Sequence, residues 1–511
     1  MGGSHRMLAG VPRPAASVTT PYAELRETHS SLVFLVQDRA YKLKKNVDLG
    51  FLDFSTREKR LDALRRELSL NRRLAPDVYL GISDVTDVDN HLMDHLLVML
   101  RMPDQSRLSR LVLAGEDVGD KVREVARVVA SFHSTCARSP QISREGSRDA
   151  LWSRWEHNLT EAEPFAGTRF DEASFRDVWR LAEVYLAGRA ALFDERIRRG
   201  AIVDGHGDLL AEDIFLLPDG PRILDCLEFD DSLRRLDRLD DVACLAMDLE
   251  RLGSPAAAKV LLDTYLEIGG DVAPPSLVHH YIAYRAFMRA KVSCLPHGVP
   301  RPYAEDPQAL VSLAESHLND SRVRLVLVGG PPGTGKTTVA GAVADALGWA
   351  VLSSDRIRKE VAGLPPESSQ RAEFEHGLYA PAWTERTYAE LLSRAEQLLS
   401  LGESVVLDAT WSDPARRDQA EMLADRTSAD LTAFRCEVAD AVADARLLGR
   451  ASLSDADEAV AGDIRARFHA WPSAITVDTG QSVEMSVERM RHRLQPWRST
   501  ASVARPRTAS D

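Results

Sequence analysis

The chain has 511 residues, of which 44% are hydrophobic and 28% are charged, and its formal net charge at pH 7 is −13. One hydrophobic core usually supports a chain of up to about 250–300 residues. This chain is longer, so we expect two or three domains. The acidic balance disfavours a nucleic-acid partner, because proteins that bind nucleic acid carry a basic domain or stripe. It leaves room for a small phosphorylated ligand in a local basic pocket.

The five cysteines are scattered and lack Cys-x-x-Cys spacing. This usage predicts reduced thiols and disfavours a zinc site or a disulfide framework. Apolar runs fall short of the about 18 residues that a membrane span needs. The composition therefore predicts a globular cytoplasmic protein that acts away from membranes.

The predicted elements of the first half change character at about residue 104. Residues 1–20 are rich in Pro, Ala, Ser and Thr and are predicted to be a flexible tail. Residues 21–103 contain two strands joined by a tight turn, a helix with leucines at helical spacing, and a further buried strand. Helical periodicity dominates residues 104–295, with short strands between 201 and 230. A strand-rich lobe followed by a helical lobe is the expected arrangement.

The second half has a different pattern and begins after a joint. Residues 296–321 combine a proline-rich stretch with one helix, and we place the linker between the halves there. From 322 to 497, strands and helices alternate, which predicts a parallel sheet with helices on both faces. Residues 498–511 lack apolar content and are predicted to be disordered.

Three acidic residues lie around the short strands of the first half, in the phrase HGDLLAEDI and at the end of RILD. Asp208 is on a loop, Asp213 follows it by five residues, and Asp225 ends an apolar strand. In a kinase-type centre the first carboxylate accepts the proton of the acceptor hydroxyl, and the other two hold Mg²⁺ against the phosphates of ATP. The spacing therefore predicts Asp208 as catalytic base and Asp213 and Asp225 as metal ligands.

The first half resembles the aminoglycoside phosphotransferase and choline kinase branch of the protein-kinase-like fold over about residues 21–295. That family has Asn where this chain has Asp213, and a carboxylate is also a competent ligand of a hard cation. A pseudokinase half that only senses nucleotide is the alternative. The residues that carry the resemblance are His206, Gly207, Asp208, Asp225, Asp237 and Asp241.

The resemblance also implies roles for residues far from the acidic cluster. Lys42 would bind phosphate, with Lys44 as the alternative on the same strand face, and Glu67 on the following helix would pair with it. The hinge that lies against adenine in this family would contain Met99 and Arg101.

Acceptor contacts are implied by the same resemblance, because the closing helices of that family line the acceptor pocket. Arg285 and Arg289, four residues apart on one such helix, would contact substrate, and structural salt bridges to nearby carboxylates are the alternative. Glu228, with Asp230 and Asp231, would form an acidic rim. Such a rim favours a polyol or amino-sugar acceptor over an acid.

The second half opens with the motif GPPGTGKT, which fits G-x-x-x-x-G-K-[ST] between an apolar strand and a helix. Glycines let backbone N–H groups wrap phosphates, and the helix N-terminus adds partial positive charge. Lys336 would reach the outer phosphates, and the Thr337 hydroxyl would ligate Mg²⁺. The predicted nucleotide-binding residues are Gly330, Gly333, Thr334, Gly335, Lys336, Thr337 and Thr338.

Polar residues after the next strands complete this second site. Asp355 is placed as the general base, Arg358 as a contact to an anionic acceptor, and Asp408 as a Walker-B-like ligand of Mg²⁺. Arg446 and Arg450, four residues apart, are typical of a lid that closes over phosphate. A helix cap for Asp355 and a solvated face for the arginine pair are the alternatives.

These motifs resemble, over roughly 322–495, the small P-loop kinases that include gluconate kinase and the kinase half of polynucleotide kinase. The Asp-x-x-Arg element suits polynucleotide kinase, so a nucleic-acid-end kinase is an alternative activity. The chain as a whole resembles actinobacterial-type proteins described as a bifunctional aminoglycoside phosphotransferase and ATP-binding protein.

The predicted fold is an α+β protein-kinase-like bilobal domain followed by an α/β P-loop kinase domain with a parallel sheet. The predicted activity is tandem phosphate transfer, with ATP and Mg²⁺, to the hydroxyl of a sugar, amino sugar or similar small molecule.

Overall fold

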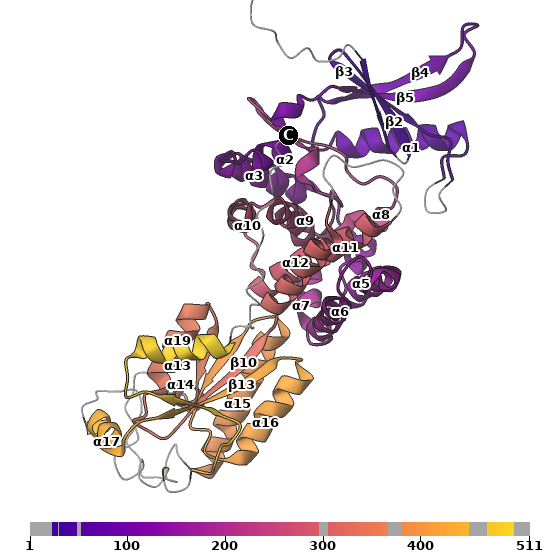
Figure 1. Ribbon diagram of the computed structural model, residues 1–511. Coiled ribbons are helices and arrows are strands. Elements are labelled where there is room, and N and C mark those ends of the chain that lie inside the picture. The colour runs from indigo at the N-terminus through magenta and orange to yellow at the C-terminus, as the bar shows by residue number, and fades with distance from the viewer. Residues whose placement is uncertain are drawn as a thin grey trace, which may run out of the picture. The chain divides into compact units, whose positions relative to one another are not determined.

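The computed structural model describes residues 23–28, 30–48, 53–295, 305–365, 380–448, 465 and 468–494 (Figure 1). Arg450 and both predicted tails lie outside the described residues. The chain forms two compact units. The first holds the described residues up to 116 together with 211–230, and the second holds 117–210, 231–295 and the described residues from 305 onward.

The first unit is built on a five-stranded antiparallel sheet of order β1-β2-β3-β5-β4, with helix α1 beside it (Figure 1). Thr56 caps α1, because its side chain accepts the N–H of Lys59. The buried stripe of α1 contains Leu64 and Glu67, so a carboxylate is packed among core residues. The elements are β1 (Ala23–Glu27), β2 (Ser31–Val36), β3 (Arg39–Lys44), α1 (Arg57–Asn71), β4 (Tyr79–Thr86) and β5 (Leu92–Leu100).

A short hairpin completes this unit and carries two of the predicted metal ligands. A 3-10 turn, η3 (Ala211–Asp213), precedes β7 (Ile214–Leu217), which pairs antiparallel with β8 (Gly220–Ile223). Two short helical segments, η1 (Asp104–Ser106) and α2 (Leu108–Leu113), pack against it.

The second unit begins with a helical lobe arranged around α9, whose residues from 239 to 249 are all buried. Strands β6 and β9 pair with each other, the short helix α8 packs against both, and β9 leads directly into α9. The elements are α3 (Gly119–Thr135), α4 (Pro140–Arg144), α5 (Arg148–Ala162), η2 (Glu163–Phe165), α6 (Glu172–Ala187), α7 (Ala190–Arg198), β6 (Ile202–Asp204), α8 (Asp231–Arg234), β9 (Arg235–Asp237), α9 (Arg238–Arg251), α10 (Pro255–Gly269) and α11 (Pro275–Cys294).

Helix α12 (Pro307–Asp320), which the sequence places in the linker, packs against α11, α6 and α9. Its His317 contacts Glu250 on α9 at 2.8 Å and His279 on α11 at 2.8 Å. Residues 321–323 then lead directly into the P-loop half. These contacts make α12 the last helix of the helical lobe. The division of the chain into domains near residue 321 stays a prediction.

The P-loop half contains the parallel sheet that the sequence predicts, with strand order β11-β12-β10-β13-β14. Val326 and Val328 point to the face covered by α13 and α19, and α15 packs with α16. Alternating side chains of a strand face opposite sides, so the buried Leu325 and Leu327 pack on the other face. Strands are β10 (Arg324–Gly329), β11 (Ala350–Ser353), β12 (Val405–Asp408), β13 (Asp430–Glu437) and β14 (Ile475–Asp478). Helices are α13 (Lys336–Leu347), α14 (Ser354–Val361), α15 (Pro381–Ser400), α16 (Pro414–Arg426), α17 (Asp440–Leu448) and α19 (Val483–Leu494).

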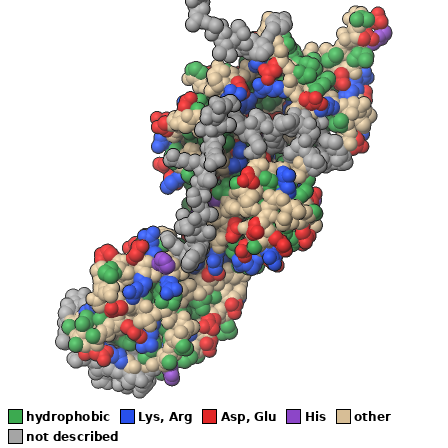
Figure 2. All heavy atoms as spheres, viewed as in Figure 1, with side chains coloured by type: hydrophobic (Ala, Val, Ile, Leu, Met, Phe, Trp, Pro, Cys, Tyr) green, Lys and Arg blue, Asp and Glu red, His purple; other side chains and the backbone are tan. Residues whose placement is uncertain are grey.

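The described surface is chemically mixed. On the face seen in Figure 2, Lys and Arg side chains are interspersed with Asp and Glu side chains. Within the described ranges, each helix is either too short or too polar to cross a bilayer.

Candidate active sites

Two lysines of β3 share one carboxylate of α1. Lys42 and Lys44 point to the same face of the strand, and their Nζ atoms lie 2.7 Å from Oε1 and 2.7 Å from Oε2 of Glu67. Burial raises the pKa of Glu67, but the two lysine charges and their hydrogen bonds outweigh it and lower this pKa to about 2. The predicted lysine–glutamate pair is therefore present, with both lysine candidates in it.

The surroundings of the two lysines distinguish their roles. Lys42 Nζ lies 3.4 Å from Oδ1 of Asp225, one of the predicted metal ligands. The Lys44 side chain is 1% exposed, with its Nζ 2.7 Å from Oε1 of Glu228 and 5.2 Å from the ring centre of Phe54. The geometry favours Lys42 as the phosphate-binding lysine and Lys44 as a structural one. Lys44 also forms an ion pair with the carboxylate of Glu228. A contact of Glu228 with the acceptor stays a prediction.

The hairpin β7–β8 brings the two predicted metal ligands of the first unit together. Asp213 immediately precedes β7, Ile214 pairs with Ile223, and the Leu224 N–H donates to the Asp213 carbonyl at 2.9 Å. Asp225 follows with φ of 63°, a strained conformation for a residue other than glycine, and its side chain is 55% exposed. Asp213 is half-buried, and carboxylate oxygens such as those of Asp213 and Asp225 are ligands that Mg²⁺ prefers.

The predicted hinge residues use their side chains inside the first unit. Met99 packs in the core with Leu97 and Val78, and Arg101 forms an ion pair with Glu24 at 3.1 Å. A contact to adenine at these positions would therefore be made by backbone groups.

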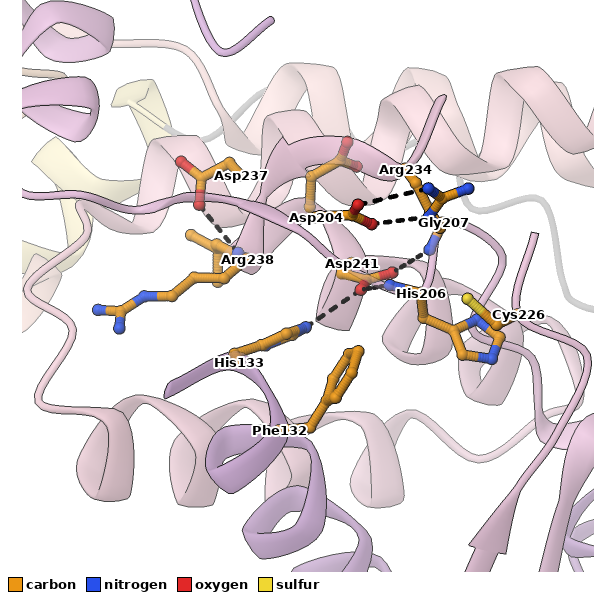
Figure 3. A network of polar contacts seen from close by, with 12 residues as sticks. Phe132, His133, Asp204, His206, Gly207, Cys226, Arg234, Asp237, Arg238 and Asp241 are labelled. Atoms are coloured by element: carbon orange, nitrogen blue, oxygen red, sulfur yellow. Dashed lines mark hydrogen bonds and ion pairs between the residues drawn. The ribbon is translucent and has the colours of Figure 1, made fainter. Parts of the chain in front are cut away.

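In the second unit, the loop that carries the predicted base Asp208 is held by Asp241, which is fully buried (Figure 3). Its carboxylate accepts the backbone N–H groups of His206 at 2.6 Å and Gly207 at 3.0 Å, and it lies 3.1 Å from Nε2 of His133. Burial raises the pKa of Asp241, but these hydrogen bonds and the histidine charges outweigh it and lower the pKa well below the ordinary range. Asp241 thus anchors the residues directly before Asp208.

Arg285 holds the same loop from the other side. Its Nε donates to Oδ1 of Asp240 at 2.7 Å and its Nη1 to the Gly207 carbonyl at 2.8 Å, and the residue is 3% exposed. Burial lowers the pKa of Arg285, but the charge of Asp240 outweighs it and raises the pKa. The salt-bridge alternative describes Arg285 better than the predicted acceptor contact.

Arg289 lies near the predicted base. It is 6% exposed and forms an ion pair with Glu305. Burial lowers its pKa, but the charges of Asp208 and Glu305 outweigh it and raise the pKa. Asp208 belongs to the second unit, and its approach to Asp213 and Asp225 stays a prediction.

The phosphate loop of the P-loop half has the backbone that its glycines predict. Gly330 has φ of 140° and Gly333 φ of 82°, and a Cβ on Gly333 would lie 2.6 Å from the Ala443 carbonyl. The loop is tied to its neighbours, because the Gly330 N–H donates to the Thr410 carbonyl at 3.1 Å. Helix α13 starts at Lys336, so its first N–H groups border the loop.

Asp408, the predicted Mg²⁺ ligand of this half, is the last residue of β12. Its register partners are Val328 and Ser353, which places it beside the strand that leads into the phosphate loop. Burial raises the pKa of Asp408 above its ordinary value, against the charge of Lys336 and hydrogen bonds from the Thr337 and Ser353 hydroxyls. Its buried Oδ1 has no hydrogen-bond partner among the described residues. A bound Mg²⁺ or its water would satisfy that atom, so the residues fit the ion.

The other predicted residues of this site lie around Asp408. Asp355 is in the first turn of α14, and its charge contributes to the raised pKa of Asp408. Arg358 lies 3.7 Å from Asp355 and is 8% exposed. Arg446 donates to the Thr479 carbonyl at 2.8 Å, and its Nη1 would lie 3.3 Å from a Cβ on Gly335. These positions agree with the predicted base, acceptor contact and lid arginine, whose roles stay predictions.

Arg417 is a residue of this half that the sequence pattern does not single out. It is 6% exposed and donates to the carbonyls of Trp411 at 2.7 Å, Ala470 at 2.7 Å, His469 at 2.9 Å and Ser412 at 3.2 Å. Arg417 therefore joins the segment after β12 to the segment before β14.

The second half is a P-loop domain, because a glycine-rich phosphate loop lies between β10 and α13 of its parallel sheet. Residues 325–471 match a family model described as an AAA domain (AAA_33).

The relatives place the chain in a family. It is 41% identical over 483 residues to uncharacterized protein Rv2004c of Mycobacterium tuberculosis and to uncharacterized protein Mb2027c of Mycobacterium bovis. Each match covers 94% of this chain and 96% of the relative. The chain belongs to the same family as these mycobacterial proteins.

Three solved structures with some likeness to parts of this chain are described as kinases or as a phosphotransferase. A choline/ethanolamine kinase family protein from Mesorhizobium loti is 16% identical, with 60% of this chain and 88% of that chain covered and a TM-score of 0.36. Aminoglycoside 2'-phosphotransferase-IIIa, solved as a GDP complex, is 16% identical, with 60% and 93% covered and a TM-score of 0.34. A putative kinase from Chloroflexus aurantiacus is 21% identical, with 34% and 99% covered and a TM-score of 0.28.

Proposed function

We propose that the chain phosphorylates hydroxyl groups of small-molecule acceptors at two separate active sites, one in each half. The observation that carries the proposal is that, in both halves, the predicted phosphate-binding lysine acts on a carboxylate predicted to bind Mg²⁺. Lys42 lies next to Asp225 in the first. In the second, the charge of Lys336 acts on the buried Asp408. A cytoplasmic location fits such acceptors and stays a prediction.

In the kinase-like half, Lys42 binds phosphate oxygens of ATP and is kept in place by Glu67. Asp213 and Asp225 would hold Mg²⁺, which neutralises charge on the phosphates when it is bound. Asp208 accepts the proton of the acceptor hydroxyl as the oxygen attacks the γ-phosphorus, and the bond from the γ-phosphorus to ADP breaks so that ADP leaves. Acidic residues near this site support a neutral or amino-bearing acceptor, such as a polyol or amino sugar.

In the P-loop half, the loop N–H groups and Lys336 bind the phosphates, and Thr337 and Asp408 would hold Mg²⁺. Asp355 accepts the proton of the second acceptor. Arg358 beside it suits an anionic group on that acceptor.

Acceptor screening with the full-length chain tests the proposal. ADP formation is measured with ATP, Mg²⁺ and a panel of sugars, amino sugars and polyols, for the parent and for Asp208→Asn and Asp355→Asn. Loss of a positioned base costs about 10²–10⁴-fold in rate, so each variant should lose one set of acceptors and keep the other. If every acceptor depended on Asp355 alone, the kinase-like half would be a regulatory sensor.

A nucleic-acid-end kinase is a second candidate for the P-loop half, favoured by the neighbouring Asp355 and Arg358. The chain's charge of −13 disfavours a nucleic-acid partner. Transfer of labelled phosphate to a 5′-hydroxyl oligonucleotide at low salt tests this candidate. Absence of transfer would exclude it.

A further inference from the structure

A tightly fitted contact joins the helical lobe to the P-loop half within the second unit. Arg189, between α6 and α7, is 0% exposed. Its Nη1 donates to the carbonyl of Thr427 at 2.6 Å and to that of Gly188 at 2.8 Å, and its Nη2 lies 3.5 Å from the carbonyl of Ser428. Thr427 and Ser428 follow the last turn of α16. A side chain of the helical lobe thus caps a helix of the P-loop half.

The charge of Arg189 is compensated mainly by backbone carbonyls. Burial lowers its pKa to about 10, against weaker opposing effects of Tyr185 and Asp430. Carbonyls at a helix C-terminus carry partial negative charge and lack partners within the helix, so they suit a cation. Tyr185 covers the guanidinium at 5.6 Å from its ring centre. A buried cation is costly without its acceptors, so this arrangement requires the P-loop half to stay in place.

Two glycines, one from each side, allow the close approach. A Cβ on Gly188 would lie 2.0 Å from the Thr427 carbonyl oxygen. A Cβ on Gly402 would lie 2.7 Å from Oγ of Ser276 and 3.3 Å from a methyl group of Leu192. The Ser276 hydroxyl also donates to the Gly402 carbonyl at 2.8 Å. The fit leaves no space for a methyl group on either of these glycines.

The contact lies at the end of the sheet that the nucleotide does not use. Gly402 precedes β12, Thr427 precedes β13, and residues 321–323 bring α12 to the start of β10. The phosphate loop follows the opposite, carboxyl end of β10. The interface therefore holds the P-loop half by the amino ends of three parallel strands and leaves its active site open.

We propose that this surface is a permanent interdomain interface whose partner is the chain's own P-loop half. Through it, the helical lobe and the P-loop half unfold and exchange amide hydrogens as one body. The inference is independent of which acceptors the two sites use.

The variant Gly188→Ala in the full-length chain tests the interface. Gly188 has φ of −94° and ψ of 4°, a conformation open to alanine. In a lobe without a docked partner the substitution would be neutral or stabilising, because alanine restricts the unfolded chain. At the interface its methyl group collides with Thr427. We expect the midpoint of thermal unfolding to fall by roughly 3 °C or more. Amide exchange at residues 427–429 should become about tenfold faster.

Gly269→Ala is the matched control, because this helical residue of the same lobe has no atom within 4 Å of the added Cβ. Its midpoint should equal or exceed that of the parent. An unchanged or raised midpoint in Gly188→Ala, with parent-like exchange at 427–429, would overturn the proposal.

Ser276→Ala keeps the test decisive if Gly188→Ala does not fold. It removes one hydrogen bond to Gly402 without adding volume. We expect faster exchange of the amides of residues 401–403, which close the turn after α15. Parent-like exchange in that turn would mean that the contact is incidental packing.

Discussion

Replacing Glu67 by glutamine should weaken the first unit in a pH-dependent way. The carboxylate is fully buried between Lys42 and Lys44, and its pKa of about 2 lies well below the ordinary value of 4.5. A depression of this size corresponds to roughly 3 kcal/mol in favour of the ionised form. Removing one partner of a buried pair leaves uncompensated charge and costs about 3–5 kcal/mol, which is the same order.

The sign of the pH dependence follows from the lowered pKa. The carboxylate contributes its full stabilisation above the pKa of about 4.5 in the unfolded chain, and loses it as the pH falls toward 2. We therefore expect Glu67→Gln to cost about 3 kcal/mol at pH 7 and less than half of that at pH 3.

Urea titration followed by hydrogen exchange of α1 and β3 amides, at pH 7 and pH 3, measures this difference. Glu58→Gln is the control, because Glu58 is on the same helix and its side chain is 73% exposed. It should change the unfolding free energy little at either pH. Equal stability of Glu67→Gln and the parent at pH 7, or a difference that does not shrink at pH 3, would refute the electrostatic account.

Three further predictions concern the P-loop half. Lys336→Ala should remove most nucleotide affinity of this half and leave that of the kinase-like half unchanged, as measured by titration calorimetry; loss at both would mean one shared site. Because burial raises the pKa of Asp408, acidification should reduce the Mg²⁺-dependent turnover of this half at a higher pH than the titration of an ordinary carboxylate would. A pH–rate profile that does not change in Asp408→Asn would contradict this prediction. Arg417→Met should weaken ATP binding about tenfold and alter tryptophan fluorescence. The reason is that the substitution removes the hydrogen bonds to the carbonyls of Trp411 and its neighbours. Arg426→Met, on the exposed face of α16, is the control and should change neither ATP binding nor fluorescence.

Features that depend on contiguous residues could be predicted from the sequence. The motif from Gly330 to Thr337 carries its own strand, loop and helix, so its geometry follows from local rules. Asp213 and Asp225 flank a short hairpin, and antiparallel pairing then brings them together.

Features that depend on distant segments could not be predicted. Lys42 and Lys44 share one strand face, and their roles separate only because Phe54 and Glu228 enclose Lys44. Arg285 contacts the carbonyl of Gly207 because α11 is rotated about its axis so that this side chain faces the loop before Asp208. The spacing of residues along the sequence does not determine that rotation.

The joint between the halves shows the same limit. Prolines near residue 300 predict a linker there, whereas helix α12 packs on the helical lobe through side chains such as His317. The residues around Gly188 and Arg189 form no sequence motif that predicts their role, because this role depends on carbonyls far away in the chain. The Thr427 carbonyl that Arg189 contacts lies 238 residues further along the sequence.

The stoichiometry of nucleotide binding tests the central claim most directly. Equilibrium dialysis of the full-length chain with Mg²⁺ and a non-hydrolysable ATP analogue should give two bound nucleotides per chain, one in Lys336→Ala and one in Lys42→Ala. A single nucleotide in the parent chain, abolished by Lys336→Ala, would contradict two separate active sites.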